Sequence, residues 1–170
     1  MTKHEYERIP YLIAYQNDSG VRDVYGGVAE LVVLESYLLR PKDTPSDTVL
    51  VFMHPIGGGS YLPIVSALAR AGHHVIYANS RYRGVDSALI MEKVLVDLGA
   101  AIRHAKEKFG YAKVVLAGWS GGGSLSLYYQ EQAEHTTVTE TPAGDPIDLA
   151  AARLIPADGI IVVAAHTRPH

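Results

Sequence analysis

Residues 114–124 have the sequence VVLAGWSGGGS, in which a serine stands in the middle of a glycine-rich stretch. Residues 114–117 are continuously apolar and too few for a helix, which is typical of a short buried strand. Residues 124–133 favour a helix. Residues 118–122, Gly-Trp-Ser-Gly-Gly, therefore predict a sharp strand-to-helix turn that presents the serine hydroxyl outside the sheet.

Such a turn forces its central residue into a strained backbone conformation, and only small neighbours avoid a steric collision there. The amides of the first helical turn point toward the serine hydroxyl and can stabilise an oxyanion. These features predict that Ser120 is a nucleophile. The alternative is a glycine-rich turn whose serine only caps the following helix.

A second glycine-rich loop, residues 54–60 with the sequence HPIGGGS, follows the apolar segment 49–53. It lacks the Lys-Ser/Thr ending of a phosphate-binding loop, and its glycine spacing does not meet the dinucleotide-binding pattern. A glycine run that lies one strand-helix unit before the serine turn suits the second amide of an oxyanion hole. The alternative is a flexible loop without a chemical role.

Strands and helices alternate along the chain from residue 49 onward. We expect strands over residues 11–15, 28–39, 49–53, 75–78, 114–117 and 160–165, and helices over residues 61–71, 86–105 and 124–133, the second of them capped by Asp86. The alternation predicts one α/β domain over residues 1–170, with a mostly parallel sheet and helices on both faces. Residues 135–158 fit the alternation poorly and suggest a lid-like excursion.

The composition excludes several function classes. A chain of 170 residues that is 48% hydrophobic and 19% charged is typical of one globular domain. A formal charge of -3 without basic runs gives no support for nucleic-acid binding. The longest wholly apolar stretch, Ile160 to Ala165, is far shorter than the ~20 residues of a membrane span. With no cysteine and no N-terminal signal pattern, we expect a cytoplasmic protein without disulfides.

The two glycine-rich loops, in this order and joined by the strand-helix alternation, resemble the α/β-hydrolase family, specifically its esterase- and lipase-like members. The resemblance covers about residues 28–165. It implies that Ser120 is the nucleophile and that Gly121 gives one backbone oxyanion donor. The resemblance also implies that Ile56 or Gly57 gives the other donor.

Other residues near the two loops take supporting roles under this resemblance. His54 would brace the oxyanion loop by hydrogen bonding, with Gly58 as a further member of that loop. Trp119 would line an acyl pocket or fill the space beneath the turn. Residues 81–84, Arg-Tyr-Arg-Gly, are similar to a loop that is usually structural in the family. We expect no metal and no cofactor, since the adjacent histidines 73–74 would point to opposite faces of a strand.

A nucleophilic serine needs a base, and the base needs an acid that orients it. In the α/β-hydrolases the acid and then the histidine follow the serine along the chain. Only one further expected strand follows Ser120, and His166 at its end is the candidate base within this chain. No acid has a distinctive spacing. We therefore expect the acid and the histidine in a C-terminal part outside this chain, carried by a second polypeptide that completes the sheet.

The resemblance implies a serine hydrolase that cleaves a carboxylic ester, or a related acyl compound, through an acyl-enzyme on Ser120. Lactone, amide and carbon–carbon bond hydrolysis on the same framework stay open. The alternative is a non-catalytic, hydrolase-like subunit that binds a small acyl ligand or serves as a scaffold. Covalent labelling by a fluorophosphonate separates the two, because it requires an activated serine.

Overall fold

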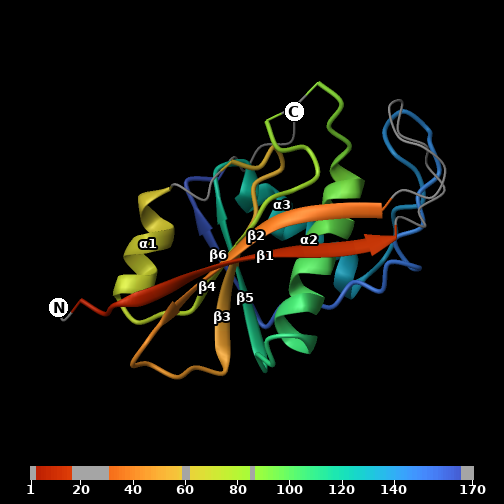
Figure 1. The fold of residues 1–170 in the computed structure, drawn as a ribbon. Helices are drawn as coiled ribbons and strands as arrows, with labels where there is room; N and C mark the ends of the chain where they lie inside the picture. The colour runs from red at the N-terminus through yellow and green to blue at the C-terminus, as the bar shows by residue number, and fades with distance from the viewer. Residues whose placement is uncertain (1–2, 17–30, 59–61, 85–86, 166–170) are drawn as a thin grey trace.

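The computed structural model describes residues 3–16, 31–58, 62–84 and 87–165, which contain one six-stranded sheet and three helices (Figure 1). The strands are β1 (Tyr6–Gln16), β2 (Leu31–Pro41), β3 (Thr48–Phe52), β4 (Val75–Ala78), β5 (Lys113–Trp119) and β6 (Gly159–Val163). The helices are α1 (Pro63–Arg70), α2 (Met91–Glu107) and α3 (Gly121–Glu134).

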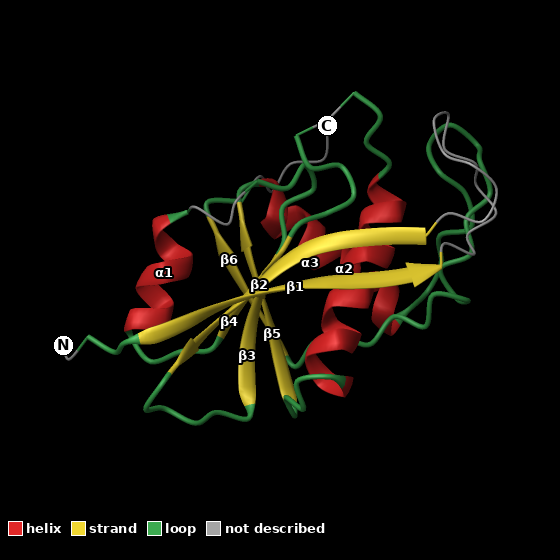
Figure 2. Ribbon diagram, viewed as in Figure 1, coloured by secondary structure: helices red, strands yellow, loops and turns green. Residues whose placement is uncertain are grey.

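The order of the strands in the sheet is β1-β2-β4-β3-β5-β6. Strand β2 runs antiparallel to both of its neighbours, β1 and β4, whereas β4, β3, β5 and β6 are parallel to one another. Helix α1 covers one face of the sheet, and α2 and α3 cover the other (Figure 2). The predicted α/β fold, with a mostly parallel sheet and helices on both faces, is confirmed.

The apolar strands feed two separate cores because successive side chains of a strand point to opposite faces. In β4, Val75 and Tyr77 belong to the core beneath α1. Their neighbours Ile76 and Ala78 belong to the larger core beneath α2 and α3. A strand buried in this way has no polar side, which is why its sequence is continuously apolar.

The N-terminal hairpin is longer than its apolar residues predict. Strand β1 begins at Tyr6 instead of residue 11, because its whole length pairs with β2, from Tyr6 opposite Pro41 to Gln16 opposite Leu31. The first half of β1 carries charged residues and a proline, so it gives little hydrophobic signal. The first three residues of the strand expected over 28–39 lie outside the described residues.

Two helices begin at places that the sequence did not indicate. Helix α2 begins at Met91, after an Ile90 that makes no side-chain cap, and the expected cap Asp86 lies outside the described residues. Helix α3 begins at Gly121, directly after the turn serine, and not at residue 124. The three glycines 121–123 give no apolar pattern, so their helical conformation was not predicted.

The segment over residues 135–158 contains no helix or strand and lies against α2 and α3. Its Ile147 and Leu149 are buried in the larger core. The hydroxyl of Tyr129 on α3 donates to the carbonyl of Ile155 at 2.9 Å, and the guanidinium of Arg103 on α2 donates to the carbonyl of Ala152 at 2.7 Å. These contacts attach the segment firmly to the helices, and its role as a lid stays a prediction.

Strand β6 lies at the edge of the sheet and pairs only with β5 among the described strands. Its side chains Ile161 and Val162 are 44% and 42% exposed. Among the described residues, this apolar strand is therefore only partly covered. None of the helices in the described part of the chain has the length and apolar character needed to cross a bilayer.

Candidate active site at the carboxyl edge of the sheet

Ser120 occupies the turn between β5 and α3 with φ 52° and ψ -126°. A positive φ is strained for a residue with a side chain, and such strain at a strand-to-helix turn is typical of an exposed nucleophile. The turn also needs glycine close by: a Cβ on Gly122 would lie 2.5 Å from the carbonyl oxygen of Met53. The sharp turn predicted from the sequence is therefore observed.

The serine does not cap helix α3, because its side chain makes no capping hydrogen bond. The Ser120 amide donates to the carbonyl of Val163 at 3.1 Å, and its carbonyl accepts from the Gly123 amide at 2.9 Å. The backbone is thus held between β6 and α3, while the hydroxyl makes no hydrogen bond within the described residues. The Gly121 amide likewise makes none there, which leaves a donor at the positive end of the helix.

The second glycine-rich loop follows β3, and its predicted oxyanion donors differ in what they bind. The Gly57 amide donates to the carbonyl of His54 at 2.9 Å and closes a tight turn. The Gly58 amide donates to Asn79 Oδ1 at 3.0 Å. The Ile56 amide makes only a long contact, 3.4 Å, to His54 Nδ1. Of the two predicted donors, the Ile56 amide therefore has the weaker hydrogen bond and is the more available to an oxyanion. Residues 59–60 of this loop lie outside the described residues.

His54 lies between the two loops. Its Nε2 atom is 3.1 Å from the place that a Cβ of Gly121 would occupy. Burial lowers the pKa of His54 below its ordinary value of 6.5, so the imidazole is neutral at neutral pH and can accept a hydrogen bond from the Ile56 amide. The position fits a histidine that braces the loop. Trp119, whose ring centroid is 6.2 Å from that of His54, is 40% exposed, and its role at an acyl pocket or beneath the turn stays a prediction.

Residues 79–84, which follow β4, hold the second glycine-rich loop in place. The Ser80 hydroxyl donates to the carbonyl of Pro55, and the Gly84 amide donates to the carbonyl of Ile56 at 3.0 Å. Asn79, whose Oδ1 accepts the hydrogen bond from the Gly58 amide, also donates through Nδ2 to the carbonyl of Glu35 at 3.1 Å. Through Gly84, the Arg-Tyr-Arg-Gly stretch within this segment thus helps to hold the backbone of the loop.

A buried ion pair anchors this bracing segment to helix α2. The Arg81 guanidinium lies 2.9 Å from Asp97 Oδ1, and the two side chains are 9% and 0% exposed. The Arg81 backbone amide donates to Asp97 Oδ2 at 2.9 Å, and the Tyr15 hydroxyl donates to the same carboxylate. Burial alone would lower the pKa of Arg81, but the Asp97 carboxylate outweighs it and raises that pKa, so the guanidinium remains charged.

Asp97 was not predicted from the sequence, although the sequence contains a signal for it. Asp97 lies in the same helix as the buried residues Val94 and Ala101, which are separated from it by one helical turn each. An acidic residue on the buried face of an amphipathic helix requires a partner, because an unpaired buried charge is costly. The partner itself was not predictable from that pattern.

Two polar residues downstream of Ser120, His135 and Asp158, lie away from the turn. His135 follows the last residue of α3, about 20 Å from Ser120 along the helix axis. Asp158 accepts from the Val114 amide at 2.8 Å, so it lies at the opposite edge of the sheet. His166, the candidate base, lies outside the described residues. Within the described ranges there is also no group of three or more metal-binding side chains.

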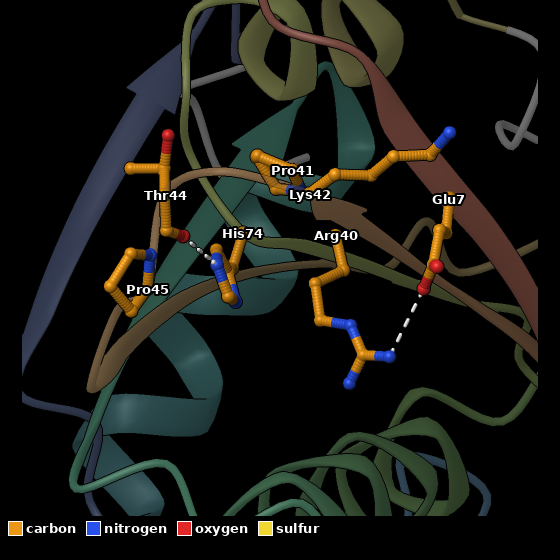
Figure 3. A pocket seen from close by; sticks show the side chains of 7 residues that line it. All are labelled: Glu7, Arg40, Pro41, Lys42, Thr44, Pro45 and His74. Carbon is orange, nitrogen blue, oxygen red and sulfur yellow. Dashed lines mark hydrogen bonds and ion pairs between the residues drawn. The ribbon is translucent and has the colours of Figure 1, made fainter.

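A cavity of about 420 Å³ also lies at the opposite edge, as Figure 3 shows from close by. It is lined by Glu7, Arg40, Pro41, Lys42, Thr44, Pro45 and His74. The imidazole of His74 is fixed by the carbonyl of Thr44 at 2.7 Å and by the hydroxyl of Tyr111 at 2.7 Å. Arg40 pairs with Glu7 at 3.0 Å. Because these polar groups bind one another and lie away from Ser120, the cavity is not the candidate active site.

Comparisons with known proteins agree with this architecture. Among solved structures, the chain is similar to a bacterial heroin esterase, with a TM-score of 0.57 at 19% identity over 92% of this chain and 45% of the other. It is similar to esterase Est22, with a TM-score of 0.58 at 14% identity over 95% and 47%. It is also similar to a fungal esterase from Rhizomucor miehei, with a TM-score of 0.52 at 20% identity over 95% and 46%.

These likenesses concern the fold, and the chain spans less than half the length of each of the three structures. A comparison with the sequences of curated proteins found no significant match. Residues 48–138 match the model of the family described as the alpha/beta hydrolase fold. This segment is more than half of the chain and contains both glycine-rich loops, so the protein belongs to the α/β hydrolase fold family.

Proposed function

We propose that this chain carries the nucleophile of a serine hydrolase, which cleaves a carboxylic ester or a related acyl compound through an acyl-enzyme on Ser120. The observation that carries the proposal is the positive φ of Ser120 between β5 and α3, with a hydroxyl that does not cap the helix. A structural turn would not need a serine at a strained position. We also propose the cytoplasm as its setting, as expected from the sequence.

In the proposed reaction, Ser120 Oγ attacks the carbonyl carbon of the substrate while a base accepts its proton. The negative charge moves to the carbonyl oxygen, where the amides of Gly121 and Ile56 donate to it. The carbon–oxygen bond to the alcohol then breaks, the alcohol leaves with the proton, and the acyl group stays on Ser120. Water attacks the acyl-enzyme in the same way, which releases the acid and restores the hydroxyl.

We further propose that the histidine base and its acid come from a part of the enzyme that this chain does not include, on a second polypeptide. Two observations support this arrangement. His135 and Asp158 lie far from Ser120, and the chain spans less than half the length of the similar esterases. The apolar edge strand β6, with Ile161 exposed, would then receive the continuation of the sheet.

A non-catalytic hydrolase-like subunit is the second candidate. The observation that favours it is that, among the described residues after Ser120, neither His135 nor Asp158 comes near the hydroxyl. Such a subunit would bind an acyl compound at the turn without breaking a bond. It would not react with a reagent that requires an activated serine.

We expect a fluorophosphonate probe to label the native protein on the peptide that contains Ser120, because the reaction needs an activated hydroxyl. Ser120→Ala should abolish the label. Ser66→Ala, in helix α1 on the other side of the sheet, should leave labelling unchanged. Peptide mass spectrometry measures the adduct. A native protein that stays unlabelled would favour the non-catalytic subunit, and labelling that survives Ser120→Ala would remove Ser120 from its role.

Gly57→Ala should lower kcat/KM for a short chromogenic ester by roughly 10²–10³, because a shift of the loop would move the neighbouring Ile56 amide away from the oxyanion. Gly57 has φ +67°, and an added Cβ would lie 3.1 Å from Arg83 Cα, so the loop must shift. Gly110→Ala is the matched control, because Gly110 has φ +75° with open space around it. Steady-state kinetics of the native protein and both variants measure kcat/KM. Equal values of kcat/KM in the two variants would contradict the loop's proposed role.

The neutral state of His54 should appear in the pH dependence of stability. Because burial lowers its folded-state pKa below the ordinary value of 6.5, its contribution is fully present above about pH 6.5 and is lost as the pH falls further. We expect the free energy of unfolding to fall more between pH 7.5 and 5.5 in the native chain than in His54→Gln. Urea unfolding at both pH values measures this. A fall of equal size in the two proteins would contradict a buried, neutral His54.

A further inference from the structure

A second cavity, of about 300 Å³, lies at the N-terminal end of helix α2. Its walls are mainly apolar and come from residues 89–91 on one side and from residues 142–143 of the long excursion on the other. The turn that forms the second wall is closed by a hydrogen bond from the Gly144 amide to the carbonyl of Thr141, at 2.9 Å. The only charged side chains in the described lining are Glu92 and Asp145, both acidic.

Glu92 is the unusual residue of this lining, because it is charged and yet only 5% exposed. One carboxylate oxygen, Oε1, accepts from the hydroxyl of Tyr128 at 3.1 Å. The other, Oε2, is buried and has no hydrogen-bond partner among the described residues. A buried carboxylate oxygen without a donor is costly, and it is normally satisfied by a cation or a donor group.

The surroundings of Glu92 favour a cation as the missing partner. Burial raises the pKa of Tyr128, and the charges of Glu92 and Glu131 raise it further, so the phenol remains protonated and does not neutralise the site. Glu92 lies in the first turn of α2, so the helix dipole offsets part of its charge. The dipole does not supply a hydrogen bond to Oε2. Asp145 at the cavity adds a second negative charge.

We propose that this cavity binds a small apolar amine in its ammonium form. The ammonium group donates to Glu92 Oε2, and the hydrocarbon body lies between residues 89–91 and 142–143. The volume is at the lower end of ordinary ligand pockets, which fits a body the size of one aliphatic ring. The opposing acidic side chains select against carboxylates and phosphates.

The amine site is separate from the proposed nucleophile. Tyr128, which holds Glu92, lies about 12 Å along helix α3 from Ser120. The proposal therefore does not depend on the hydrolase reaction, and Ser120→Ala should bind the amine as the native chain does.

Isothermal titration calorimetry of the full chain at neutral pH tests the proposal with cyclohexylamine and its neutral analogue cyclohexanol. We expect cyclohexylamine to bind, cyclohexanol to bind at least about 10-fold more weakly, and Glu92→Gln to lose at least about 10-fold in cyclohexylamine affinity. Glu107→Gln makes the same change at the exposed far end of α2 and should stay within about 3-fold of the native chain.

Amide chemical shifts of the native chain give a readout that does not require Glu92→Gln to fold. Cyclohexylamine should shift the signals of residues 89–92 and 141–145 and leave those of residues 118–123 unchanged. Equal affinity for the alcohol, unchanged affinity in a folded Glu92→Gln, shifts centred elsewhere, or absence of amine binding would each overturn the proposal.

Discussion

The close approach of the β5–α3 turn to the end of β3 is the constraint on which the candidate site depends. Strands β3 and β5 are parallel neighbours, with Val51 opposite Leu116, so their carboxyl ends meet at one edge of the sheet. At that edge a Cβ on Gly122 would lie 2.5 Å from the carbonyl oxygen of Met53. Only a glycine lets the two backbones come this close, and their contact brings His54 against the turn that carries Ser120.

The second glycine-rich loop would be poorly fixed without the segment that follows β4. Hydrogen bonds from Ser80 and Gly84 hold its backbone, and the buried pair of Arg81 with Asp97 ties that segment to α2. Removing one partner of such a pair typically costs ~3–5 kcal/mol, because the other charge is left buried and uncompensated. Geometry at the candidate oxyanion loop is therefore maintained by a helix on the far side of the segment.

The parts of the fold that the sequence predicts are those encoded locally. The turn at Ser120 follows from a strand, a set of glycines and a helix within one short stretch, and parallel strands such as β4 follow from continuous apolar runs. The network of Tyr15, Arg81 and Asp97 joins residues far apart in the chain, so no local pattern encodes it. The same holds for the first half of β1, which is a strand only because it pairs with β2.

The crystal structure of a phosphonate adduct of the native protein is the sharpest test of Ser120 as the nucleophile. We expect a covalent bond from phosphorus to Ser120 Oγ, with the phosphoryl oxygen about 2.7–3.1 Å from the amide nitrogens of Gly121 and Ile56. A phosphonate bound to another residue would show that Ser120 is not the nucleophile. An adduct on Ser120 whose phosphoryl oxygen faces away from both amides would contradict the proposed oxyanion donors.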